Sequence, residues 1–176
     1  REAVPATRSV EEVIIRTGEL STQTAESTNS RGSSLADHQD RHLHLRATCS
    51  VEPSGIYHIR QELLNPLGTI FHFRCDDRTT AENNPEAPDA LSYLSAGIGF
   101  CFMTQFGRYA TMMKKNLEQY HLLQKTNFRR GVKGHQGSTD DVRTDVYLKT
   151  TEDDSFAQDI LDISEQTCFL HALCRT

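Results

Sequence analysis

The chain has 176 residues, a formal net charge of -5 and 36% hydrophobic residues, which is enough for one domain of ordinary size with a single core. The acidic balance and the lack of basic runs argue against nucleic acid or an anionic membrane as the main partner, and favour small molecules or proteins. No apolar run approaches the roughly 18 residues of a membrane span, and the first residues lack the apolar stretch of a signal peptide. We therefore expect a soluble, cytoplasmic protein.

The N-terminal part of the chain is polar. Residues 19–40 lack hydrophobic periodicity and contain almost nothing to bury, which predicts a loop or flexible arm. We accordingly divide the chain into a partly flexible arm, residues 1–40, and one domain, residues 41–176.

The domain begins with a pattern typical of strands. Every second residue is apolar from Leu43 to Val51, which places these side chains on one face of a strand. Turn sequences follow at 53–55 and 65–68, so that 56–64 and 69–75 are predicted as two further antiparallel strands. Together the three segments form a meander.

The second half of the chain alternates between helical and strand patterns. After a loop that ends at Pro88, apolar residues recur at helical spacing as far as Leu117, which predicts a buried helix of about 30 residues. Strands are expected at 122–133 and 142–149. Ser155 and Gln158 fit a capping box at the start of two short helices, the last of which carries Cys168. The order β-β-β-α-β-β-α predicts an α+β fold, with an antiparallel sheet wrapped on a long central helix.

The cysteines are the strongest chemical signal. There are five, an odd number in a chain too long to need a disulfide framework, so most are expected to be free thiols. Cys101 lies in the apolar segment 88–104 and Cys168 in a second apolar segment, 164–173. A paired thiol suggests redox chemistry. Taken alone, Cys101 on an apolar stripe also fits a small buried core residue.

These two segments resemble the cysteine helices of the OsmC/Ohr family, the osmotically inducible and organic hydroperoxide resistance proteins, which are thiol peroxidases. The resemblance covers roughly residues 70–176, and its most specific parts are the cysteine spacing and the small residues before Cys101. It is closest to the OsmC-like subgroup. It implies an intertwined homodimer that reduces organic hydroperoxides or hydrogen peroxide without a cofactor, using a thiol reductant such as a lipoyl-type dithiol.

The resemblance also implies the roles of the thiols. Cys101 attacks the peroxide and becomes a sulfenic acid, and Cys168 resolves it to a disulfide. Cys174 is a poor substitute for Cys168, because six residues rotate a helix by about 600° and place it about 120° away. A thiol three turns inside a helix gains little from the helix dipole, so its thiolate needs a nearby cation.

Arg74, at the end of the third strand of the meander, resembles the family's active-site arginine by its place before the loop and the long helix. Its guanidinium suits both a thiolate and peroxide oxygens. The alternative is a solvent-exposed strand-end arginine, in which case Arg46, Arg60 or a partner subunit supplies the cation.

The family holds this arginine with a carboxylate, commonly in an Asn-Pro-Glu sequence ten residues before the cysteine. Here Glu86 completes such a sequence 15 residues before Cys101, and Asp89 lies 12 residues before it. Either carboxylate can orient Arg74. A second departure is Phe169, which stands where the family usually has proline.

Two other interpretations follow from the sequence. Four histidines fall on or near the predicted strands, but no Cys-x-x-Cys or His-Glu-x-x-His spacing accompanies them, so we expect dispersed histidines and no metal site; they are His42, His44, His58 and His72. The second is an alternative function, a catalytically weak or inactive OsmC-like binding or assembly module that keeps its thiols and has lost the arginine-carboxylate pair.

Overall fold

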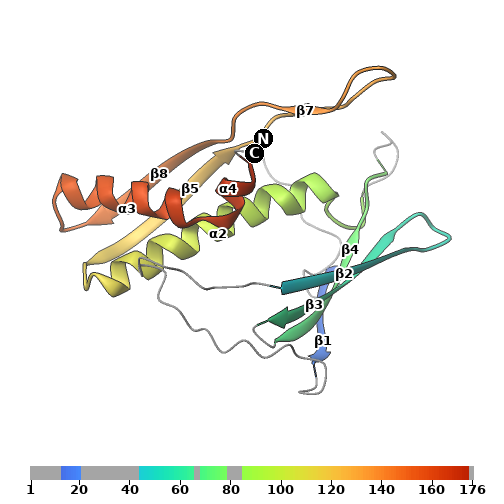
Figure 1. Ribbon diagram of the computed structural model, residues 1–176, viewed down its shortest axis with the longest axis horizontal. Helices are drawn as coiled ribbons and strands as arrows, with labels where there is room; N and C mark the ends of the chain where they lie inside the picture. The colour runs from blue at the N-terminus through green and yellow to red at the C-terminus, as the bar shows by residue number, and fades with distance from the viewer. Residues whose placement is uncertain (1–12, 21–43, 66–67, 79–84, 175–176) are drawn as a thin grey trace. The chain divides into compact units, whose positions relative to one another are not determined.

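The computed structural model describes residues 13–20, 44–65, 68–78 and 85–174 (Figure 1). The arm predicted at residues 19–40 falls almost entirely outside these ranges, so the division of the chain at residue 40 stays a prediction. The chain forms two compact units, residues 1–90 and 91–176, which we describe separately. In the described residues, no helix combines the length and the apolar character needed to cross a bilayer.

The first unit is built on a four-stranded antiparallel sheet in the order β1-β4-β3-β2. The strands are β1 (Ile14–Glu19), β2 (His44–Val51), β3 (Tyr57–Asn65) and β4 (Thr69–Cys75). The predicted meander is confirmed as β2, β3 and β4. Strand β1 was not predicted, because its short sequence contains Gly18 and lacks sustained alternation; the pairing register with β4 shifts between Arg16 and Gly18.

In its described residues, the second unit contains three helices and two pairs of strands. Its elements are α2 (Ala90–Met112), β5 (Leu117–Lys125), β6 (Phe128–Arg129), β7 (Ser138–Thr139), β8 (Arg143–Thr150), α3 (Asp154–Thr167) and α4 (Phe169–Cys174). Strand β5 pairs with β8, and the short β6 pairs with β7, both antiparallel. The predicted strand at 142–149 is confirmed as β8. The strand predicted at 122–133 begins earlier and is interrupted after Lys125.

Helix α2 is shorter than predicted. It ends at Met112 because Lys114 adopts a left-handed conformation, with φ of 53°. The N–H of Lys115 then donates to Ala110 O at 2.9 Å and that of Lys114 to Thr111 O at 3.3 Å, the two bonds of a Schellman motif. Leu117, which fits the helical spacing, is instead the first residue of β5.

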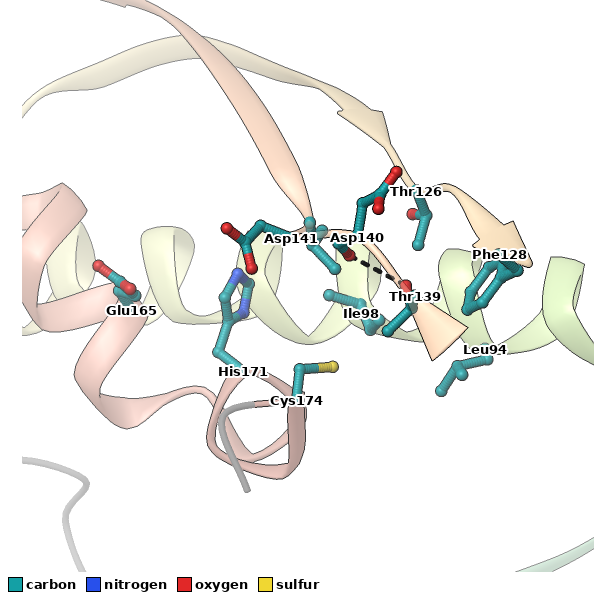
Figure 2. Close-up of a pocket in the computed structure, with 11 residues that line it drawn as sticks. Leu94, Ile98, Thr126, Phe128, Thr139, Asp140, Asp141, Glu165, His171 and Cys174 are labelled. Atoms are coloured by element: carbon teal, nitrogen blue, oxygen red, sulfur yellow. Dashed lines mark hydrogen bonds between the residues drawn. The ribbon is translucent and has the colours of Figure 1, made fainter. Parts of the chain in front are cut away.

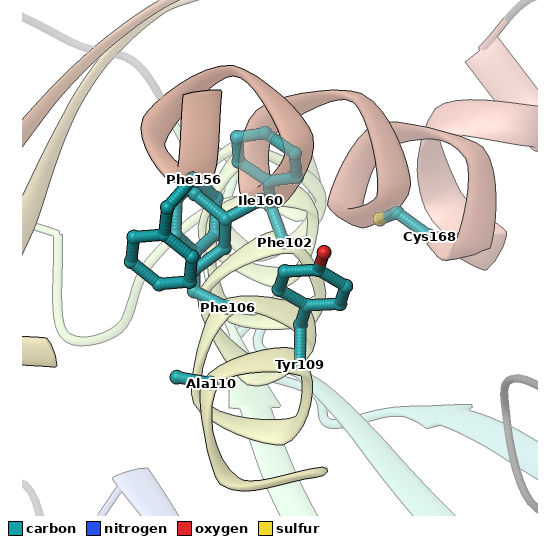
Figure 3. Packing of buried hydrophobic residues seen from close by; sticks show 7 residues of the cluster. All are labelled: Phe102, Phe106, Tyr109, Ala110, Phe156, Ile160 and Cys168. Carbon is teal, nitrogen blue, oxygen red and sulfur yellow. The ribbon is translucent and has the colours of Figure 1, made fainter. Parts of the chain in front are cut away.

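The helix is also buried on one face only. Ile98, Phe102, Phe106 and Tyr109 are buried, whereas the side chain of Phe100 is 69% exposed. The buried face forms a core with Phe156 and Ile160 of α3 and with Cys168, and apolar residues of β5 and β8 pack against it (Figure 3). Aromatic rings interlock across this core, with Phe102 and Phe106 edge to face at 5.0 Å and Tyr109 stacked on Phe156 at 6.2 Å.

The start of α3 differs from the predicted capping box. The N-cap is Asp153, whose Oδ1 accepts from the backbone N–H of Phe156 at 3.0 Å and from Ser155 Oγ at 2.8 Å. Ser155 lies inside the first turn, and Gln158 donates to Asp162 at 2.8 Å. A carboxylate two residues before the expected cap therefore satisfies one of the free N–H groups of the first turn, that of Phe156.

We expect Asp153→Ala to lower the melting temperature by about 2–4 °C, because α3 loses its cap. Ser155→Ala, which removes the hydroxyl and leaves the cap in place, is the matched control and should have a smaller effect. Thermal unfolding followed by circular dichroism measures both. Equal shifts in the two variants would contradict the assignment of Asp153 as the cap.

Candidate functional site

The two predicted catalytic thiols meet in the second unit. Cys101 is partly buried in the middle of α2, and the thiol of Cys168, only 1% exposed, lies close enough to interact with it. All five cysteines are free thiols, in agreement with the sequence prediction. The structure thus brings Cys101 and Cys168 together, as their proposed chemistry requires; their roles stay predictions.

The placement of Cys168 corrects the sequence analysis. It was predicted inside the last helix, but it is the C-cap of α3, with extended φ and ψ of -82° and 112°. Its N–H donates to Glu165 O at 3.4 Å, and its carbonyl accepts from the N–H of Ala172 at 3.1 Å. Cys168 therefore lies at the junction of two helices, and Figure 3 shows its sulfur turned toward the core.

The surroundings of Cys168 disfavour the ionisation of its thiol. Burial, and after it the interactions with the Cys101 thiol and with its charge, raise the pKa of Cys168 to about 11. The backbone N–H groups of His171 and Leu170 act in the opposite direction. At neutral pH Cys168 is consequently a protonated thiol that can donate to Cys101, which leaves Cys101 as the candidate for the reactive thiolate.

His171 also belongs to this site, although the sequence analysis missed it. Its Nδ1 lies 3.1 Å from Sγ of Cys168, and its ring packs on Phe102 with 4.7 Å between centroids. The signal was present in the spacing, since residues three apart on a helix face the same side. This spacing became informative only once the structure showed that α4 begins directly after Cys168.

A pocket of about 440 Å³ lies beside this histidine (Figure 2). Its wall combines the apolar side chains of Leu94 and Ile98 with the carboxyl groups of Asp140, Asp141 and Glu165. His171 lines it as well. The exposed Cys174 opens onto the same pocket, whereas Cys168 lies in the core.

In the first unit, Arg74 lies beside one of its two candidate carboxylates. Arg74 Nη2 is 3.4 Å from Oε2 of Glu86, with side chains that are 20% and 39% exposed respectively. Asp89 immediately precedes α2, and its charge assists burial in raising the pKa of Cys75. The proximity of Glu86 supports its pairing with Arg74, and the functional roles of Arg74, Glu86 and Asp89 stay predictions.

A buried aspartate holds the loop that carries Glu86. Asp76 is 3% exposed, and its carboxylate accepts two bonds from the guanidinium of Arg78, at 2.8 and 2.7 Å. It also accepts from the backbone N–H of Glu86 at 3.0 Å, and its own N–H donates to Pro88 O at 3.2 Å. Arg78 in turn donates to Ser54 O at 3.0 Å. Asp76 thereby ties both ends of the loop to the sheet.

Sequence reasoning missed Asp76 because it stands in a run of charges, 76–78, that is typical of an exposed loop.

The alternative cations considered for the thiolate are engaged in ion pairs elsewhere. Arg46 contacts the buried carboxylate of Glu62 at 2.6 Å and Arg60 contacts it at 2.5 Å. Within the part of the chain that the structure describes, no group of three or more histidine, cysteine or acidic residues is arranged to hold a metal ion.

A family model for OsmC-like proteins matches residues 82–176. The chain belongs to the OsmC-like family. No curated protein matches it.

Solved structures of this family share the fold of the chain at low sequence identity. An OsmC-like protein from Mycoplasma pneumoniae is 10% identical, with a TM-score of 0.58 over 78% of this chain and 89% of that one. An organic hydroperoxide resistance protein OsmC from Legionella pneumophila is 14% identical, with a TM-score of 0.52 over 78% and 92%. An organic hydroperoxide resistance protein from Elizabethkingia anophelis is 16% identical, with a TM-score of 0.51 over 78% of this chain and 90% of that one. The predicted α+β, OsmC-like fold is confirmed.

Proposed function

We propose that this OsmC-like protein is a thiol-dependent peroxidase that reduces organic hydroperoxides or hydrogen peroxide. The observation that carries the proposal is the placement of Cys101 beside the buried thiol of Cys168 at one core. The names of the Legionella and Elizabethkingia proteins, which describe organic hydroperoxide resistance, support the same chemistry. The apolar side chains packed around Cys101 favour an organic peroxide.

In the proposed reaction the thiolate of Cys101 attacks the distal peroxide oxygen. The O–O bond breaks, the alcohol leaves with a proton, and Cys101 becomes a sulfenic acid. Cys168 then attacks that sulfur, so that a disulfide forms and water leaves. An external dithiol, of the lipoyl type that the family resemblance implies, reduces the disulfide and restores both thiols. A homodimer is part of this proposal.

The proposal is tested by the fate of the thiols. One equivalent of an organic hydroperoxide should remove two hydrogens from the reduced protein, and peptide mapping without reductant should link Cys101 to Cys168. Parallel treatment with hydrogen peroxide shows which substrate reacts faster. A protein whose cysteines stay reduced, or whose disulfide excludes Cys101, would contradict the proposal.

In this proposal Arg74, in the same chain or from a second subunit, stabilises the thiolate, and Glu86 or Asp89 orients it. Arg74→Ala should shift the pH dependence of Cys101 alkylation upward by about two units, equivalent to roughly 2.7 kcal/mol, and slow alkylation tens-fold at neutral pH. Arg74→Lys restores the charge without the two-pronged geometry and should recover only part of the peroxidase rate. Arg143→Ala removes an exposed guanidinium and is the control. Superimposable alkylation curves for Arg74→Ala and wild type would show that Arg74 is a surface residue.

One observation keeps the binding or assembly module as a second candidate. The 3.4 Å between Arg74 and Glu86 is longer than the 2.7–2.9 Å typical of a charge-assisted hydrogen bond. A contact of this length between the arginine and its candidate carboxylate is consistent with a weak enzyme. Labelling of Cys101 at mildly acidic pH separates the two functions, because only an activated thiol reacts quickly there.

A further inference from the structure

The resolving step of the proposed peroxidase cycle needs a base that has not yet been assigned. Cys168 must lose its proton to attack the sulfenic acid, yet its thiol is buried and its pKa is raised to about 11. Few such thiols are ionised at neutral pH, so resolution by Cys168 needs a base within hydrogen-bond reach.

His171 meets that geometric requirement. Its Nδ1 lies 3.1 Å from Sγ of Cys168, within the reach of a proton transfer. The thiol is the donor in this contact when the imidazole is neutral and carries its proton on Nε2. The ring is fixed by its packing on Phe102, the residue that follows Cys101.

From this geometry we infer that His171 is the general base of the resolving step. Nδ1 takes the thiol proton of Cys168 as its sulfur bonds to the sulfur of Cys101, and the S–O bond of the sulfenic acid breaks. The released hydroxide leaves as water after it receives one proton, from the imidazolium or from solvent. This inference rests on the proposed peroxidase function.

The charges around His171 suit the role. Asp140 and Asp141, which precede β8, and Glu165 of α3 line the same pocket as the imidazole (Figure 2). Their negative charges favour the imidazolium that forms during the transfer. Asp140 is also paired with Arg129, whose Nη2 lies 2.6 Å from its Oδ1. Among the described residues, the thiol of Cys174 lies on the pocket, and those of Cys101 and Cys168 lie on the core side. Imidazole is the side chain whose ordinary titration range lies closest to neutral pH, which suits a base that accepts and then returns a proton.

The experiment isolates the attack by Cys168 from peroxide chemistry. In a background with Cys49, Cys75 and Cys174 replaced by serine, 2,2′-dithiodipyridine releases one thiopyridone when Cys101 is modified. A second is released when Cys168 displaces the mixed disulfide. His171→Asn keeps a polar atom near the Nδ1 position without its basicity, and His171→Phe keeps the ring on Phe102. His121→Gln, in an exposed histidine of β5, is the control.

We expect both His171 variants to slow the second release about 100-fold and to leave the first unchanged. In the wild type and in His121→Gln the second rate should fall as the pH is lowered through the titration of a histidine, and this fall should be absent from the variants. A second release that keeps the wild-type rate and pH profile in both variants overturns the inference, even if peroxide oxidation succeeds. A slowed second release in protein that does not react with peroxide supports the role of His171 and contradicts the peroxidase function instead.

Discussion

Cys101→Ser is expected to abolish peroxide consumption, whereas Cys168→Ser is expected to consume one equivalent and stop. The difference follows from the proposed roles, in which Cys101 attacks the peroxide while Cys168, whose pKa is raised by burial in the core, acts only in the second step. Without Cys168 the sulfenic acid at Cys101 has no resolving thiol and persists long enough to be trapped. Peroxide consumption, together with mass spectrometry after treatment with a sulfenic-acid probe, measures both results.

Cys174→Ser provides the matched control, because this thiol is exposed and lies six residues beyond Cys168 in the same terminal segment. It should retain full turnover. Unchanged turnover in Cys101→Ser would end the peroxidase interpretation. Repeated turnover in Cys168→Ser at the wild-type rate would instead assign the resolving role to another thiol.

Asp76→Asn is expected to lower the free energy of unfolding by about 3 kcal/mol, because it leaves the guanidinium of Arg78 beside a neutral amide in a buried site. Urea unfolding measures this loss. Asp77→Asn removes the same charge from the adjacent exposed position and should have little effect. The peroxidase rate should fall as well, since Asp76 fixes the backbone of Glu86.

The pH dependence of stability gives an independent test of Asp76. Its hydrogen bonds with Arg78, and then those from backbone N–H groups, hold the pKa of the carboxyl well below its usual range. The stabilisation is therefore fully present above the unfolded-state pKa, about 4, and is lost as the pH falls toward the lower folded-state pKa. Wild type should lose this contribution in acid, and Asp76→Asn should not. Parallel stability curves for the two proteins below pH 4 would contradict the assignment.

Patterns with a clear period were predictable from the sequence. The alternation around β2 and β8 and the turn residues between β2, β3 and β4 located these strands within one or two residues. The helical spacing located α2 but not its end, because the left-handed cap is Lys114, where glycine is the usual signal. The cap of α3 was misplaced because Asp153 and Ser155 have similar cap preferences, and packing decides between them.

The site was predictable only in part, for a related reason. The family resemblance identified Cys101 and Cys168, and in the structure these two thiols lie next to each other. Burial is not visible in a charged tripeptide, so Asp76 and its hold on the loop could not be found from residues 76–78. His171 became meaningful only when two helices were seen to meet at Cys168.

The position of Cys168 at that junction has a consequence for the disulfide that the proposed function requires. A cysteine in the middle of a helix can draw its sulfur toward a partner only by straining the hydrogen bonds of the turns around it. At the junction, φ and ψ of a single residue can rotate while the regular turns of α3 are kept. In the proposed peroxidase cycle we therefore expect the aromatic core that rests on Phe156 and Ile160 to stay packed when the disulfide forms. The backbone change that the proposed disulfide requires would then be confined to Cys168, and α3 would keep its hydrogen bonds in the oxidised protein.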